Sequence, residues 1–171
     1  FIGSCRPVST EEEALQFIAD KKSKYWDASH NVYAYILRNG GIQRFSDDGE
    51  PQGTAGIPVI ESMKKAGVVD AVVVATRYFG GILLGGGGLI RAYSHTASIA
   101  VAAAEKIRMK RCLFGEIVCG YDSYGRVEPL VADCGGVTVG TDFTDKVSIR
   151  FYLEPENWER LSGKLGDATS G

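Results

Sequence analysis

Hydrophobic and polar positions change period several times along the first part of the chain. Residues 11–24 follow Ser9 and Thr10, either of which can cap a helix, and begin with three glutamates that suit a helix N-terminus. Residues 30–38 alternate between apolar and polar side chains as a strand does. The NGG turn at 39–41 joins that strand to a partner strand. The pattern therefore predicts a helix followed by a β-hairpin.

A helix, a buried strand and a longer helix are predicted next. Residues 57–67 have helical spacing, which turns Ile57 toward the core, and the following run VVDAVVVATRY is apolar enough for a strand buried on both faces. The longer helix extends from the glycine cluster to about Arg108. Its apolar positions recur at helical spacing: Leu89, Tyr93, Ala97, Ala100, Val101 and Ala104.

The remainder of the chain has a different order of elements. Residues 112–121 predict a strand, 122–135 a helix, 136–154 two strands, and a last helix begins at Pro155 with Trp158 in its core. This βαββα order is ferredoxin-like but one strand short, and the last strand of such a unit would follow the final residue. We therefore expect an α+β protein with two domains, 1–108 and 109–171.

Charge and cysteine content narrow the possible functions. The net charge is −2, which argues against a nucleic-acid binder that works by bulk charge. The charge is uneven, because residues 1–108 carry 12 basic and 11 acidic side chains and residues 109–171 carry 7 and 10. Four cysteines without C-x-x-C spacing and two histidines do not indicate a metal site or a cofactor. With no signal peptide or membrane-length apolar run, we expect a cytoplasmic protein with no membrane partner.

The stretch TRYFGGILLGGGGLIRAY, residues 76–93, holds six of the 22 glycines. It joins the buried strand to the long helix, so its glycines can bring backbone N–H groups at a helix N-terminus close to a ligand. No Walker or dinucleotide-binding spacing is present. One interpretation is a turn that allows tight packing; the other is an anion or phosphate site. Its residues would be Arg77, Gly85, Gly86, Gly87, Gly88, Arg91 and His95.

A second polar cluster precedes the predicted helix at 57–67. Carboxylates in such a turn can hold a cation or activate a water, or they can cap the helix and pair with the two arginines of the glycine stretch. We favour the structural pairing, and whether the carboxylates face those arginines or the solvent stays open. The cluster consists of Asp47, Asp48, Glu50 and Thr54, together with His30 as a candidate base.

Two long motifs resemble the Impact family, which comprises YigZ-like bacterial proteins and the related eukaryotic Impact translational regulators. The motifs are DDGEPQGTAGIPV at 47–59 and VVVATRYFGGILLGGGGLIRAYSHTA at 72–97. The segments FIGSCRPVSTEEEALQFI and DASHNVYAYIL also resemble the opening of that family. The second part of the chain is similar to the accessory domain of its bacterial members.

The resemblance implies a fold and a setting. The first domain would be similar to the second domain of a small-subunit ribosomal protein, and the ferredoxin-like second domain would resemble domain V of elongation factor G. Both relatives contact RNA or ribosomal surfaces. The family has no established set of catalytic residues to carry over, and the partner of the eukaryotic members is not transferred to this bacterial layout.

Three functional hypotheses follow. The leading one is a non-catalytic binding protein, associated with nucleic acid or the ribosome in translation regulation, whose glycine loop and arginines contact phosphate. The second is an enzyme acting on a small phosphorylated or peptide-like substrate with Asp47, Asp48 and Glu50. The third is a protein-interaction module with an exposed apolar patch. The sequence leaves the ligand, the partner and the oligomeric state open.

Overall fold

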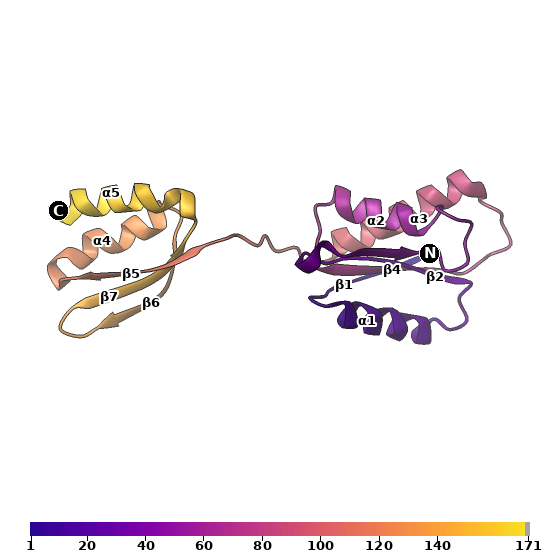
Figure 1. Cartoon of the computed structure of the whole chain (residues 1–171), viewed down its shortest axis with the longest axis horizontal. Helices are drawn as coiled ribbons and strands as arrows, with labels where there is room; N and C mark the ends of the chain where they lie inside the picture. Colours follow the sequence, from indigo (N-terminus) through magenta and orange to yellow (C-terminus); the bar gives the residue numbers. More distant parts are fainter. Residues whose placement is uncertain (170–171) are drawn as a thin grey trace. The chain divides into compact units, whose positions relative to one another are not determined.

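The computed structural model describes residues 1–169, which form a mixed α+β protein with two sheets and five α-helices. The predicted α+β class is therefore confirmed. Two compact units divide the chain, Phe1–Lys106 (unit 1) and Ile107–Gly171 (unit 2), and each has its own sheet and helices (Figure 1).

Unit 1 contains a four-stranded antiparallel sheet in the order β1-β4-β2-β3. The two central strands, β4 and β2, place His30 opposite Arg77. The start of β2 and the end of β4 therefore lie at the same end of the sheet. The hairpin predicted around residues 39–41 is confirmed, with β2 and β3 paired across a short 3₁₀ turn. The strands are β1 (Ile2–Pro7), β2 (His30–Ile36), β3 (Gln43–Ser46) and β4 (Ala71–Arg77).

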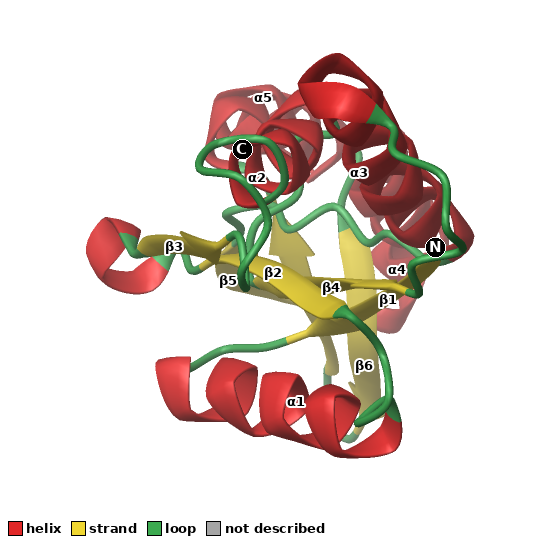
Figure 2. Cartoon of the chain, turned by 90° about the vertical axis from the view of Figure 1, so that its right-hand side faces the viewer, coloured by secondary structure: helices red, strands yellow, loops and turns green. Residues whose placement is uncertain are grey.

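Helices cover both faces of this sheet. α1 (Glu11–Lys24) packs on one face, and α2 (Gly56–Lys65) and α3 (Gly85–Ala103) pack on the other (Figure 2). Thr10 caps α1, because its hydroxyl accepts the Glu13 N–H at 3.2 Å. Every residue of β4 is buried as a result, which agrees with its unbroken apolar sequence.

Unit 2 has a three-stranded antiparallel sheet in the order β5-β7-β6. Its α-helices both lie on one face, so β7 alternates between buried apolar residues and the more exposed Ser148, Arg150 and Tyr152 (Figure 1). The predicted order of strand, helix, two strands and helix is confirmed. These elements are β5 (Leu113–Cys119), α4 (Tyr121–Asp133), β6 (Val137–Phe143), β7 (Val147–Leu153) and α5 (Trp158–Thr169).

Several details differ from the sequence predictions. α3 ends at Ala103 rather than near Arg108, because the apolar stripe that packs on the sheet stops at Val101. Ile57 is exposed, since the neighbouring Pro58 and Val59 occupy the buried face of α2. Trp158 stacks on a core phenylalanine but keeps 40% of its surface exposed, so it borders the core of unit 2.

Candidate functional site

A concave cleft of about 410 Å³ opens at the edge of the unit 1 sheet where β2 begins and β4 ends. We call it the β4–α3 cleft, because its walls come from the end of β4, the following loop and the start of α3, with the turn after β3 on the other side. Its size lies within the range of small-molecule sites. It is lined by His30, Glu50, Pro51, Arg77, Phe79, Leu83, Leu84, Gly85, Gly86 and Leu89.

Glu50 is the central charged residue of the cleft wall. It is 8% exposed, and its Oε1 accepts hydrogen bonds from Arg77 Nη1 at 2.6 Å and from the Tyr93 hydroxyl at 2.7 Å. A buried carboxylate is stable only when such donors compensate its lost hydration. Burial raises the pKa of Tyr93 above its usual range, and the hydrogen bond to Glu50 raises it further.

Arg77 is buried at the end of β4 and is held from two directions. Its guanidinium lies 5.7 Å from the ring centroid of Phe1 and 5.5 Å from that of Phe79, which are cation–π distances. Since Glu50 neutralises its charge, Arg77 adds little net positive potential to the cleft. The interpretation in which the cluster carboxylates pair with an arginine is thus confirmed for Glu50 and Arg77.

The other two carboxylates of the cluster have structural roles. Asp47 Oδ1 accepts the N–H groups of Ala55 and Gly56 at 3.1 and 2.7 Å, so it caps the start of α2. Asp48 accepts the Asn31 N–H at 2.6 Å and contacts the Lys22 ammonium at the same distance. Both lie outside the cleft lining, which leaves Glu50 as the carboxylate of this cluster that faces the cleft.

Thr54 and His30 hold the turn that carries Glu50. The Thr54 hydroxyl donates to the Pro51 carbonyl at 2.7 Å, and its methyl group lies beside Gly86. His30 Nδ1 is 2.8 Å from the Asp48 carbonyl oxygen, and its Nε2 is 3.8 Å from Glu50 Oε1. The structure therefore brings His30 and Glu50 together on one wall of the cleft. Thr54 does not line the cleft, and its hydroxyl bonds to the backbone of the turn that carries Glu50.

The glycines Gly85–Gly88 form the first turn of α3 and not a loop before it. We call this segment the glycine turn. Gly85 has a φ of 67°, a conformation that glycine adopts without strain, and Leu84 before it makes no side-chain capping bond. Within residues 1–169, no side chain accepts a hydrogen bond from the N–H groups of this turn. The first three N–H groups of α3, those of Gly85, Gly86 and Gly87, are therefore open, and the helix dipole adds a partial positive charge.

The remaining predicted residues of the anion site lie on the helix beside the cleft. Gly87, Gly88, Arg91 and His95 do not line it. Arg91 is exposed but folds back over the glycine turn, since a Cβ atom on Gly87 would lie 3.8 Å from Arg91 Nη1. His95 is exposed one helical turn further along α3.

Sequence reasoning placed Tyr93 only among the apolar core positions. A tyrosine in a helical core stripe brings a hydroxyl that needs a partner when it is buried, and that requirement was the available signal. The apolar lining residues Leu83 and Leu84 were also missed. They belong to an exposed segment, since Ile82 and Leu83 are 75% and 87% exposed, and this segment forms the rim of the cleft.

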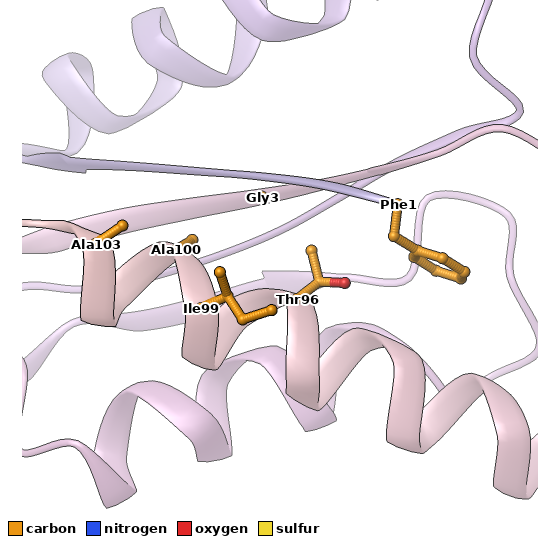
Figure 3. A pocket seen from close by; sticks show the side chains of 6 residues that line it. All are labelled: Phe1, Gly3, Thr96, Ile99, Ala100 and Ala103. Carbon is orange, nitrogen blue, oxygen red and sulfur yellow. The ribbon is translucent and has the colours of Figure 1, made fainter.

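Other features of the described chain carry less chemistry. A smaller cavity of about 170 Å³ between β1 and α3 is lined by Phe1, Gly3, Thr96, Ile99, Ala100 and Ala103 (Figure 3). Its one side-chain hydroxyl, that of Thr96, already donates to the Ala92 carbonyl. Residues 1–169 contain no group of three or more possible metal-ligating side chains and no helix long and apolar enough to cross a membrane.

Comparison with known proteins finds a matching family model for each unit. A family model described as the Impact N-terminal domain matches residues 1–101, and one described as a domain of unknown function (DUF1949) matches residues 117–171. The IMPACT family member YvyE of Bacillus subtilis is 36% identical, over 100% of this chain and 79% of that protein. The IMPACT family member YigZ of Escherichia coli is 32% identical, over 94% and 80%.

A solved structure is similar along almost the whole chain. It is described as the crystal structure of a hypothetical protein, and it shares 30% sequence identity with a TM-score of 0.60. The match covers 99% of this chain and 84% of that one.

Proposed function

The chain belongs to the Impact family, and from this premise we propose that unit 1 is a non-catalytic binding module that holds a phosphate group of RNA or of the ribosome at the mouth of the β4–α3 cleft. The resemblance drawn from the motifs at 47–59 and 72–97 is confirmed at the level of the family. A role in translation regulation, in the cytoplasm, is part of this proposal and rests on the resemblance to the Impact regulators.

One observation carries the proposal: the free N–H groups of the glycine turn donate a hydrogen bond to no side chain of the described chain. A helix N-terminus normally has its first N–H groups capped, and here Leu84 supplies no cap. Gly85 and Gly86 line the cleft, so their amides are at a concave surface that a ligand can enter. Backbone N–H groups at such a position, without side chains in the way, suit a phosphate.

Charge near the glycine turn supports the same ligand. Arg77 is neutralised by Glu50, whereas Arg91 is exposed and its guanidinium lies against Gly87. Arg91 is therefore the fixed charge that accompanies the open amides, and His95 borders the same helix face. The net charge of −2 for the whole chain limits non-specific attraction to nucleic acid, so recognition would depend on these few groups.

The test uses Arg91→Ala in the full chain and a short fluorescein-labelled single-stranded RNA as probe. We expect weaker binding at low salt and a plot of log affinity against log salt that is shallower by about 1, because one phosphate contact is lost. Arg126→Ala is the matched control, since Arg126 is an exposed arginine on a helix of unit 2. Equal affinity and equal salt slope in Arg91→Ala and the parent protein would refute the proposal.

An enzyme is the second candidate, because the cleft joins Glu50 and His30 to the glycine turn as the enzymatic hypothesis requires. Asp47 and Asp48 no longer support it, since both serve the backbone. The measurement is release of inorganic phosphate from a panel of phosphomonoesters. Turnover that Glu50→Gln abolishes in a folded protein would favour the enzyme over the binding module.

A protein-interaction module is the third candidate, favoured by the exposed apolar rim at residues 78–84 and by Trp26, which is 82% exposed. Tyr78 donates to Asp27 at 2.8 Å, so the rim and the Trp26 turn are neighbours. Trp26→Ser separates this function from phosphate binding, because Trp26 lies outside the cleft lining. It would abolish capture of a protein partner and leave the affinity for inorganic phosphate unchanged.

We also propose the finer fold relationships. Residues 107–169 of unit 2 correspond to the first five elements of a ferredoxin-like fold, which is supported by the order β5-β7-β6, by antiparallel pairing throughout and by two helices on one face. In that fold the last strand pairs with the outer edge of the first, which here is β5. Unit 1 corresponds to the second domain of a small-subunit ribosomal protein, and superposition on such a domain checks this relationship.

A further inference from the structure

The carboxylate of Glu50 has one oxygen that the protein itself does not use. Both donors, Arg77 Nη1 and the Tyr93 hydroxyl, bond to Oε1, and in residues 1–169 Oε2 has no hydrogen-bond partner. The only fully sealed side-chain nitrogen or oxygen without a partner in that range is Arg150 Nε. Oε2 is therefore not fully sealed, although the Glu50 side chain as a whole is only 3% exposed, and Glu50 lines the cleft wall. A carboxylate oxygen that accepts no hydrogen bond from the protein is thus available to a ligand.

His30 supplies a second acceptor on the same wall. The Asp48 carbonyl can only accept, so the 2.8 Å contact requires Nδ1 of His30 to carry the proton. In the neutral ring Nε2 is then an acceptor. It lies 3.8 Å from Glu50 Oε1, too far for a hydrogen bond between the two side chains. Neighbouring acceptors with no donor between them suit a ligand that brings adjacent N–H groups.

The charge balance of the wall selects a neutral donor. Glu50 and Arg77 form a buried pair at 2.6 Å, so their charges cancel, and a cationic ligand would face the Arg77 guanidinium. A neutral group with adjacent N–H donors avoids that repulsion. The imino and amino groups of guanine have this arrangement. Phe79 lines the same cleft with half of its surface exposed, which gives a planar base a ring on which to stack.

We infer that the β4–α3 cleft recognises a guanine base through Glu50 Oε2 and His30 Nε2. The inference rests on the proposed function, because it names the base that accompanies the phosphate bound at the glycine turn. The ligand class is a guanine nucleotide, either free or as a residue of an RNA strand. Base recognition and phosphate binding depend on different atoms, so they can be tested separately.

The first experiment changes the ligand and leaves the protein intact. Calorimetry on the full chain compares guanosine, inosine and 1-methylguanosine monophosphates with adenosine monophosphate. Inosine lacks the amino group and 1-methylguanosine the imino hydrogen, so each should bind about 5- to 100-fold more weakly than guanosine monophosphate. Replacing one guanosine by inosine in a short RNA gives the same comparison for a strand. A loss seen only in the strand would assign the site to RNA, whereas a loss seen also in the mononucleotide would assign it to free nucleotides as well.

The second experiment changes His30 in two ways. His30→Asn places its amide nitrogen where Nδ1 donates to the Asp48 carbonyl and removes the outer acceptor, whereas His30→Gln places an amide oxygen near the Nε2 position. His30→Asn should lose most of the preference for guanosine over inosine, and His30→Gln should keep part of it. Thermal unfolding of both variants reports whether the turn is intact, so loss of preference in a folded protein is attributable to the acceptor.

The outcomes distinguish the inference from the proposed function. Equal affinity for all the purine nucleotides, with binding of ribose 5-phosphate retained, would overturn the guanine site and leave the phosphate site standing. A preference for guanosine over inosine, with an affinity that changes neither on removal of the 5′-phosphate nor in Arg91→Ala, would support the guanine site and overturn the phosphate role. Failure of every one of these ligands to bind would overturn both.

Discussion

The two units pack helices on antiparallel sheets but differ in where they keep polar groups. Every buried polar or charged residue of the described chain lies in unit 1: Asn31, Glu50, Thr76, Arg77 and Thr96. Unit 2 buries apolar side chains, and its ion pairs, such as Arg150 with Asp142, are exposed. Burying charge is costly unless partners compensate it. The difference therefore marks unit 1 as the unit whose packing has been adapted to hold a polar site.

The largest expected effect comes from breaking the buried pair of unit 1. Glu50→Ala leaves the Arg77 guanidinium and the Tyr93 hydroxyl buried without their acceptor, and should lower the free energy of unfolding of unit 1 by about 3–5 kcal/mol. Asp142→Ala breaks the exposed pair of unit 2 and should cost less than about 1 kcal/mol. Native-state hydrogen exchange measures the two stabilities separately, because amides of β4 report on unit 1 and amides of β7 on unit 2. Similar costs in both would show that burial does not decide the strength of these pairs.

Backbone contacts give the next largest difference. A Cβ atom on Gly56 would lie 2.9 Å from Phe45 Cδ2 and 2.9 Å from the Ser46 carbonyl carbon, so Gly56→Ala should destabilise unit 1 by about 1–3 kcal/mol. Gly125 on α4 has open space around it, and Gly125→Ala should stabilise unit 2 by up to about 1 kcal/mol. Chemical denaturation measures both. The comparison fails if the two substitutions change stability in the same direction.

Alkaline pH should weaken unit 1 through its buried tyrosines. Burial raises the pKa of Tyr93 and of Tyr35, with further contributions from hydrogen bonds to Glu50 and Glu11. A raised pKa in the folded state contributes stability that is fully present below the unfolded value, near pH 10, and is lost as pH rises through the folded value. Above about pH 10 each tyrosine should therefore lower the free energy of unfolding by about 1.4 kcal/mol per pH unit. Tyr93→Phe should remove its share of that slope, and an unchanged slope would contradict the assignment.

The smallest expected effect on stability comes from replacing Arg91, the second arginine of the stretch at 76–93. Arg91 is exposed, so Arg91→Ala should change the free energy of unfolding by less than about 0.5 kcal/mol while it weakens binding of RNA. Denaturation of the variant beside its binding curve makes the comparison. A large loss of stability would mean that Arg91, like Arg77, belongs to the structure and not to the ligand site.

Local patterns predicted most of the secondary structure. The Thr10 cap, the NGG turn at 39–41 and the unbroken apolar run of β4 each contain their signal within a few residues, and each was correct. Errors occurred where a local sequence pattern extends further along the chain than the tertiary packing does. The helical pattern after the glycines continues to Ala104, but the last buried residue of α3 is Val101 and the helix ends at Ala103, so α3 is shorter than predicted.

The site was predicted only in its parts. The sequence pointed to a glycine cluster, two arginines and a carboxylate turn, but side-chain spacing alone does not assign partners across the fold. Asp47, Asp48 and Glu50 are alike in sequence, yet the first caps α2, the second contacts Asn31 and Lys22, and the third faces the cleft. Tyr93 entered the polar network because its hydroxyl meets Glu50 across the core.

The sequence by itself determined the family, the α+β class and the order of helices and strands, because periodicity, caps and long motifs are local and survive without knowledge of packing. The tertiary structure decided which of two similar arginines is buried and which is free, and which carboxylate lies beside His30. Those assignments depend on the antiparallel register of β2 against β4 and on where α3 crosses the sheet. Arg77 and Tyr93 follow Glu50 by 27 and 43 positions in the sequence. They contact Glu50 only once the strand register and the position of α3 are both fixed.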